Sequence, residues 1–169
     1  MAQRATFPRE RILDAAYALT REKGWENVSA RSVARKLGSS TMPIYSSMKS
    51  MEEIERGVRE RAEAALEETQ RRRVTDNPSM DLAIGYVAFA RREPHLFRFL
   101  YAQRPRRLGA RELERQSSGF RGTFGGSPAL KKMIDSIPQL STNPLILKSW
   151  IFVHGLATLV GSGALDIPE

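Results

Sequence analysis

Small hydroxyl side chains are concentrated in residues 39–50, which read SSTMPIYSSMKS. A helix that enters the major groove of DNA, about 12 Å wide, needs exposed side chains that are small or can form hydrogen bonds. The side chains that fit this need are Ser40, Thr41, Pro43, Ser46 and Ser47. Ile44 and Met48 have the spacing of core residues on the same short helix. The segment therefore has the chemistry of a helix that contacts nucleic acid.

Side chains for catalysis are scarce in this chain. It has no cysteine, its two histidines are His95 and His154, and neither an HExxH motif nor a Gly-rich phosphate loop occurs. Without cysteine there is no disulfide, no thiolate metal site and no thiol nucleophile. We therefore expect no enzyme activity, no metal and no cofactor.

The overall charge favours a polyanionic partner. The 169 residues include 27 basic and 19 acidic ones, a net charge of +8. Such an excess is typical of proteins that bind nucleic acid or an anionic membrane surface. The most apolar stretch, residues 144–159, is interrupted by Lys148 and His154, and residues 1–12 lack the apolar core of a secretory signal. The absence of a spanning segment and of a signal predicts a cytoplasmic protein with no membrane partner, whereas the charge alone leaves an anionic membrane surface open.

The elements that must position these side chains are predicted to be helices throughout, which gives an all-α fold. Apolar residues recur at 3.6-residue spacing, and no strand-like alternation bounded by turn residues occurs. The predicted helices are residues 9–23, 30–37, 39–48, 51–72, 80–92, 95–103, 128–137 and 144–161, with a basic, weakly periodic loop over residues 104–126. Ser29 and Ser50 are predicted N-caps, and Glu53 has the capping-box spacing from Ser50.

Residues 12–54, ILDAAYALTREKGWENVSARSVARKLGSSTMPIYSSMKSMEEI, resemble the tetracycline-repressor (TetR) family of transcriptional regulators. The resemblance is carried, in order along the chain, by Ile12–Ala16, Gly24–Trp25, Ser29, Val33–Ala34, Leu37–Gly38 and Ile44–Tyr45, together with the cap formed by Ser50 and Glu53. It implies a helix-turn-helix DNA-binding domain in residues 1–50 and a connecting helix in residues 51–73. Residues 74–169 would then form a helical bundle that binds an effector and forms a homodimer.

The resemblance also implies a role for single residues in binding double-stranded DNA. In the family, the positions of Ser29, Tyr45 and Lys49 contact phosphate, and those of Arg31, Thr41, Met42 and Ser46 lie near base edges. The chemistry is suitable, because hydroxyls and lysine bind phosphate and arginine can bind guanine through two hydrogen bonds. The family commonly has a bulky aromatic at the position of Ser47 and a lysine at that of Met51. Because Met51 cannot make the phosphate contact of that lysine, we expect Lys49 to contribute more of the binding to phosphate.

Simpler interpretations of these residues remain open. Ser29 and Ser50 would cap helices in any protein, Tyr45 could pack on the first helix, and Arg31 could be a solvated surface residue.

In the second half, residues 81–101 and 150–155 are similar to patterns in TetR-family effector domains. The residues expected to line an effector cavity are Phe89, Phe97, Leu100, Tyr101, Met133, Ile137, Trp150 and His154. Ligand cavities are mostly apolar with a few polar groups, but aromatic residues at helical spacing can equally be plain core. The many nearby arginines favour an apolar or amphipathic effector that is neutral or anionic. Gly155, Ala157, Gly161 and Gly163 would allow close approach of helices in a dimer.

The expected function is that of a transcriptional regulator, in particular a repressor that leaves a pseudo-palindromic operator when it binds the effector. The alternative is a basic helical protein that binds RNA or anionic membranes, and the arginines between residues 104 and 121 support it. That alternative leaves the ordered motif in residues 12–54 unexplained.

Overall fold

The computed structural model describes residues 7–101 and 144–167, and every regular element in these residues is helical. The elements are α1 (Arg9–Lys23), the 3-10 turn η1 (Trp25–Asn27), α2 (Ala30–Lys36), α3 (Met42–Ser47), α4 (Met51–Gln70), α5 (Pro78–Arg92), α6 (Pro94–Tyr101) and α9 (Pro144–Gly161). The all-α prediction holds for this part of the chain. None of the helices described is long and apolar enough to cross a membrane.

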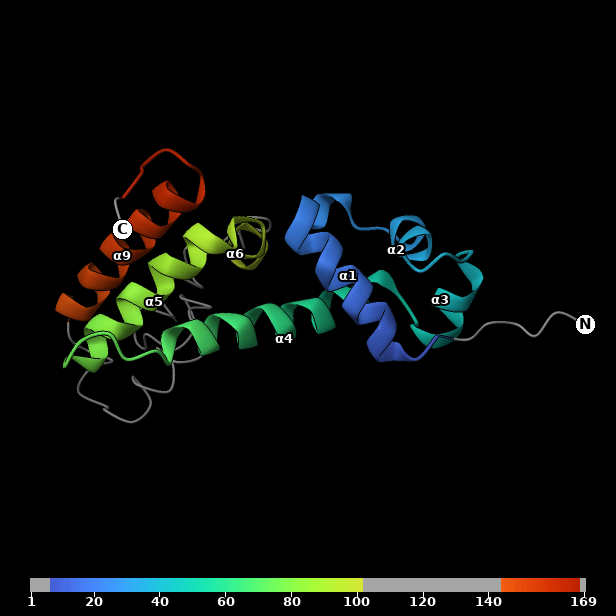
Figure 1. Cartoon of the computed structure of the whole chain (residues 1–169), viewed down its shortest axis with the longest axis horizontal. Helices are drawn as coiled ribbons and strands as arrows, with labels where there is room; N and C mark the ends of the chain where they lie inside the picture. Colours follow the sequence, from blue (N-terminus) through green and yellow to red (C-terminus); the bar gives the residue numbers. More distant parts are fainter. Residues whose placement is uncertain (1–6, 102–143, 168–169) are drawn as a thin grey trace, which may run out of the picture.

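The molecule is elongated, with helices grouped at two ends (Figure 1). We call α1, η1, α2 and α3 the N-terminal unit, and α5, α6 and α9 the C-terminal unit. The long helix α4 runs along both: it packs on α1 and also on α5, while α6 contacts α1. Helix α3 lies in the N-terminal unit at the end of the molecule away from α9 (Figure 1).

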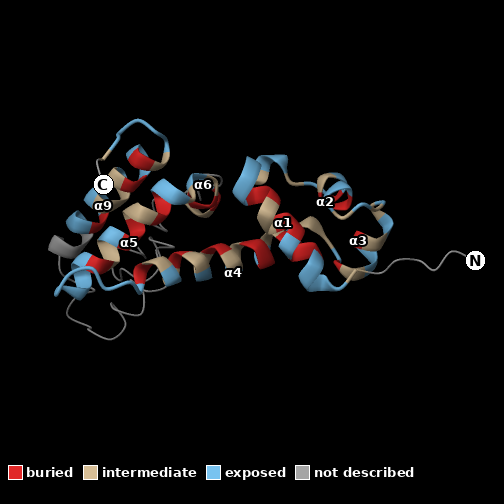
Figure 2. Ribbon diagram, viewed as in Figure 1, coloured by how far each residue is buried: buried red, intermediate tan, exposed pale blue. Residues whose placement is uncertain are grey.

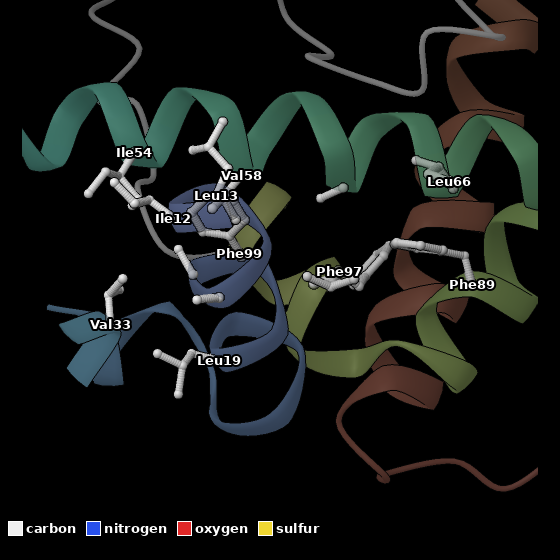
Figure 3. Close-up of a cluster of buried hydrophobic side chains, with 14 of the residues drawn as sticks. Ile12, Leu13, Leu19, Val33, Ile54, Val58, Leu66, Phe89, Phe97 and Phe99 are labelled. Atoms are coloured by element: carbon white, nitrogen blue, oxygen red, sulfur yellow. The ribbon is translucent and has the colours of Figure 1, made fainter. Parts of the chain in front are cut away.

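One line of buried side chains continues through both units. Figure 2 shows the buried residues of α4 on the side that faces the other helices. Ile54 and Val58 of α4 lie beside Ile12 and Leu13 of α1, and Leu66 lies toward Phe89 of the C-terminal unit (Figure 3). These residues are at most 4% exposed, so α4 is held by apolar burial along most of its length.

Local sequence signals set the ends of the N-terminal helices. Pro8 precedes α1, and Gly24 stops it in a backbone conformation with φ of +84° that is easy only for glycine. Ser29 caps α2: its hydroxyl accepts a hydrogen bond from the N–H of Ser32, and the Ser32 hydroxyl accepts one from the N–H of Ser29. The ends of α1 and α2 match the predicted ones within a residue, whereas α3 begins at Met42, three residues after its predicted start, because residues 38–41 form the turn after α2.

Two side chains hold the turn between α4 and α5: that of Asn77, which caps α5, and that of Asp81 in its first turn. Asn77 caps α5 through the N–H groups of Ser79 and Met80. The buried carboxylate of Asp81 accepts hydrogen bonds from the N–H groups of Val74 and Thr75 and from the Thr75 hydroxyl. Burial of this carboxyl favours its neutral form, but the three hydrogen bonds outweigh that effect and lower the pKa of Asp81. Helix α4 ends at Gln70, and the segment around the predicted boundary after residue 73 is a turn fixed by these hydrogen bonds.

Helix α9 packs on α5 through small residues. Ala157 is fully buried, and a Cβ added at Gly161 would lie 3.1 Å from the carbonyl oxygen of Ala90. Two of the four small residues expected at a dimer face therefore serve contacts within the chain. Gly155 is open to solvent, and Gly163 lies in the turn after the helix with φ of +73°. The predicted helix at residues 128–137 and the loop at residues 104–126 lie outside the described residues.

Candidate nucleic-acid interface

Helices α2 and α3 are joined by a short turn. The turn contains Gly38 with φ of +66°, and the N–H of Ser39 donates to the carbonyl of Ala34 to close the end of α2. Val33 and Ala34 bury the inner face of α2, and Ile44 and Met48 anchor α3 at 0% and 1% exposure. The prediction that Ile44 and Met48 face the core is confirmed. The opposite face of α3 is consequently turned to solvent.

The outward surface of α2, the turn and α3 carries most of the residues expected to bind DNA. Met42 and Tyr45 are large side chains that are 59% and 56% exposed. The other exposed members are Ser29, Arg31, Ser40, Ser46 and Lys49, while Thr41 and Pro43 are half-buried. We call this set of nine residues the α2–α3 surface. Tyr45 is turned to solvent and does not pack in the core, so the simpler interpretation of this residue is not supported.

Ser47 is not part of the α2–α3 surface, because its side chain is hydrogen-bonded to the segment before α1. Its hydroxyl is half-buried and donates to the carbonyl oxygen of Phe7 at 2.7 Å. This bond ties the segment before α1 to the end of α3. The Ser46 hydroxyl, in contrast, is exposed and donates to the carbonyl of Met42, four residues earlier in the same helix.

The junction of α3 and α4 is fixed by Ser50 and Glu53. The Ser50 hydroxyl accepts a hydrogen bond from the N–H of Glu53, which confirms the predicted cap. The Glu53 carboxylate accepts from the N–H of Lys49 at 2.8 Å and pairs with Arg9 at 3.0 Å. The Glu53 carboxylate therefore accepts from the residue before the cap, Lys49, and not from Ser50 itself. The capping-box spacing had singled out Glu53, and the structure shows that this side chain positions the backbone of Lys49.

Charge on the N-terminal unit is positive. Residues 1–50 contain nine basic and four acidic residues, whereas residues 51–101 contain nine basic and ten acidic ones. Within the described part of the chain, no carboxylate pairs with Arg31 or with the ammonium group of Lys49. The α2–α3 surface therefore presents unneutralised cations, backbone N–H groups near a helix start and hydroxyls, which together can bind phosphates and base edges.

The residues expected to line an effector cavity meet instead around Tyr86, which sequence reasoning missed. Its ring centroid lies 5.3 Å from that of Phe97, 5.6 Å from Tyr101 and 4.9 Å from Trp150. Its hydroxyl lies 2.9 Å from Nδ1 of His154. We call these five residues the aromatic cluster. A signal for Tyr86 existed, because it precedes the predicted residue Phe89 by three positions on the same helical face.

This cluster is packed side chain against side chain. Tyr86, Phe89 and Phe97 are at most 5% exposed, and the ring of Trp150 stacks on His154 at 5.7 Å. The cluster members Tyr101 and His154 are half-buried, as is Leu100. Met133 and Ile137 lie outside the described residues, so their part in such a cavity is not placed. The interpretation of these aromatics as core fits the described residues.

Three contacts join the N-terminal unit to α6 and the end of α5. The guanidinium of Arg21 on α1 binds both carboxylate oxygens of Glu93, the residue that ends α5, and Nε donates at 2.7 Å. Arg98 on α6 pairs with Glu26 of η1 at 2.5 Å. In addition, the ring of Trp25 packs on Phe99 with centroids 5.1 Å apart. We call these contacts the unit interface.

The unit interface also involves α4. The guanidinium of Arg59 lies 4.8 Å from the centre of the Phe99 ring and donates to the carbonyl of Leu100 at 3.3 Å. That carbonyl is among the last in α6, where helical acceptors lack a partner within the helix. One arginine thus holds the end of α6 against the helix that runs between the units.

No protein-family model matches this chain, and no curated protein sequence matches it either. In the described residues, no group of three or more histidine or acidic side chains is placed to hold a metal ion.

Proposed function

We propose that this chain is a sequence-specific DNA-binding transcriptional regulator, with α2 and α3 as a helix-turn-helix and α3 as the recognition helix. The observation that carries the proposal is the division of α3 into a buried side, Ile44 and Met48, and an outward polar side at the end of the molecule. A recognition helix needs this division, because one side must be fixed while the other enters the major groove.

The α2–α3 surface supports a specific assignment of roles. The hydroxyl and helix-start N–H groups near Ser29, the Tyr45 hydroxyl and the Lys49 ammonium bind phosphates, which set the position of the protein on DNA. Arg31, Thr41, Met42 and Ser46 read base edges, and Arg31 suits guanine because a guanidinium can make two parallel hydrogen bonds to it. Ser40 and Pro43 border the groove. Ser47 has a structural role through Phe7.

The regulatory part of the proposal concerns the C-terminal unit. The chain acts as a cytoplasmic homodimer on a pseudo-palindromic operator, and a small apolar or amphipathic effector releases it. Two recognition helices must match half-sites about 34 Å apart. An effector that binds better to a form with a different spacing shifts the population away from DNA. The unit interface supports this coupling, because it joins α1 directly to the end of α5 and to α6.

The test is selection of binding sites from a random duplex library by the full chain, followed by affinity measurements on the selected site. We expect an enriched sequence with approximate two-fold symmetry. Tyr45→Ala and Lys49→Ala should weaken binding to selected and unselected duplexes alike. Arg31→Ala should reduce discrimination at particular base pairs by about 1–3 kcal/mol. The matched control is Arg72→Ala, which removes an exposed arginine in the turn after α4.

Single-stranded and double-stranded RNA and anionic vesicles serve as competing ligands in the same assay. Tighter binding to RNA or to vesicles than to any duplex DNA would favour the alternative, a basic helical protein for those partners. An unchanged preference profile in Arg31→Ala would remove Arg31 from the base-reading set.

A further inference from the structure

A groove of about 420 Å³ runs between α5 and α9. Its α5 wall is built from Met80, Ala83, Ile84, Val87 and Ala88, and α9 contributes Phe152, Val153, Leu156 and Val160. On α5, positions 80, 84, 87 and 91 form one helical stripe, opposite to the stripe of Asp81, Gly85 and Phe89 that faces the core. Helix α5 is therefore apolar on two sides, and its second apolar side lines this groove.

The groove leaves large apolar side chains in contact with solvent. Phe152 is 71% exposed, Met80 51% and Ile84 40%. The outward stripe of a surface helix is normally polar, and a contiguous exposed apolar surface marks a binding site. The volume lies within the range of about 300–1,000 Å³ for small-molecule pockets.

One end of the groove is positively charged. Arg91 and Arg92, in the last turn of α5, and Ile167, after α9, complete its lining, and none of the lining residues is acidic. Arg92 is exposed, and no carboxylate in the described part of the chain pairs with it. An apolar channel that ends at arginine side chains is complementary to an anionic head group on an apolar chain.

We propose that the α5–α9 groove binds an amphipathic carboxylate, with an unbranched aliphatic chain along Met80, Ile84 and Val87 and its carboxylate at Arg92. Residues 80–92 of a helix span about 18 Å, which suits an acyl chain of medium length. The site lies on the opposite side of α5 from the aromatic cluster, so it is distinct from the cavity that the sequence predicted.

The position of the carboxylate suggests how such a ligand acts on DNA binding, and this step rests on the proposed function. Arg92 is followed directly by Glu93, whose carboxylate binds Arg21 of α1. An anion at Arg92 is one residue along the chain from this ion pair, so its charge acts differently on an arrangement in which Arg21 binds Glu93 and on one in which the pair is open. The ligand then has unequal affinity for the two arrangements, which any effector requires.

Binding is tested with dodecanoate, below its micelle concentration, by calorimetry and by the melting temperature of the full chain. Arg92→Gln should weaken dodecanoate binding by about tenfold or more, as expected for loss of a charge-assisted hydrogen bond. It should leave the affinity for dodecanol unchanged. Ala88→Phe fills the groove, and Ile84→Glu places an acidic group at an exposed position that already tolerates solvent; both should abolish dodecanoate binding. Arg72→Gln is the control for loss of an exposed arginine.

Unchanged affinity for dodecanoate in Arg92→Gln and Ile84→Glu would overturn the proposal. So would a concentration-dependent dimer that Phe152→Ser dissociates and dodecanoate does not, because the groove would then be covered by a second copy. If dodecanoate binds as expected while no duplex DNA binds, the ligand site stands and the proposed function fails. If duplex DNA binds and dodecanoate does not, the proposed function stands and the ligand site fails.

Discussion

The imidazole of His154 is the member of the aromatic cluster that can change charge near neutral pH. Burial disfavours the imidazolium and lowers the pKa of His154. Its Nδ1 can accept a hydrogen bond from Tyr86 only while that nitrogen is unprotonated. Burial also raises the pKa of the Tyr86 hydroxyl, so this group stays neutral and able to donate. The hydrogen bond between Tyr86 and His154 is therefore stable only while both side chains are neutral.

This pair predicts a loss of stability at mildly acidic pH. The unfolded chain takes up a proton on His154 near its ordinary pKa of about 6.5, whereas the folded chain does so only at lower pH. The contribution is therefore full above about pH 6.5 and decreases as the pH falls toward the folded-state pKa. Melting temperatures measured between pH 7.5 and 5.5 should fall less steeply in His154→Gln than in His95→Gln. Equal slopes in the two variants would contradict this assignment.

At the scale of elements, two glycines of the C-terminal unit have opposite surroundings. A Cβ added at Gly85 would lie 2.7 Å from the Cα of Gln70 and 2.9 Å from the carbonyl oxygen of Thr69, so α4 and α5 touch at backbone distance there. A Cβ at Gly155 of α9 would meet nothing within 4 Å. Replacing each glycine by alanine therefore distinguishes the effect of packing on stability, at Gly85, from that of helix propensity, at Gly155.

We expect Gly85→Ala to destabilise the chain by about 1–3 kcal/mol, since a backbone contact cannot yield as a flexible side chain can. Gly155→Ala should be neutral or stabilise by up to about 1 kcal/mol, the usual gain from replacing glycine inside a helix. Urea unfolding measures both free energies. Equal stability of Gly85→Ala and Gly155→Ala would show that α4 and α5 do not pack this closely.

At the scale of the whole molecule, the unit interface adds to the shared helix α4 in coupling the unfolding of the two ends. Besides the contacts of Arg59, it contains two ion pairs, Arg21–Glu93 and Glu26–Arg98, and the contact of Trp25 with Phe99. The four charged side chains are partly exposed, and pairs of this kind stabilise by about 0–1 kcal/mol each. Their removal should weaken the coupling of the units more than the stability of either.

The two tryptophans lie in different units and allow this to be measured. In chains that retain only Trp25 or only Trp150, the fluorescence transitions in urea should coincide, as for two-state unfolding. Adding Glu93→Gln with Arg98→Gln should separate the two midpoints by about 0.5 M, given an m-value of about 1–3 kcal/mol/M. The control pair is Glu67→Gln with Arg71→Gln, which removes an ion pair within α4 and its end. Coincident midpoints in both double variants would rule out coupling through these ion pairs.

Charge distribution over the whole molecule leads to a prediction about salt. The basic excess of residues 1–50 lies in the unit that carries the α2–α3 surface. DNA affinity should therefore fall steeply with salt, with a logarithmic slope of about −0.9 for each phosphate contact. Lys49→Ala should make this slope shallower by about one, while Arg72→Ala leaves it unchanged. An affinity independent of salt would exclude phosphate contacts as the main source of binding.

Helix type and helix ends were determined by the sequence, because they depend on neighbouring residues. Pro8, Gly24, Ser29 and Ser50 act through backbone geometry or hydrogen bonds within a few positions, and the helices they bound lie where the periodicity predicts them. The spacing of Ile44 and Met48 likewise predicted which side of α3 is buried, since one short helix has one apolar side.

Contacts between distant residues were decided only by the tertiary structure. The Ser47 hydroxyl binds the carbonyl of Phe7, 40 positions away, which no local pattern indicates. Tyr86 meets His154 across 68 positions, and Arg21 meets Glu93 across 72. Periodicity could not choose the buried side of α5, because its two opposite faces are both apolar. Packing against α4 at Gly85 made that choice, and it left the other face to line the groove with α9.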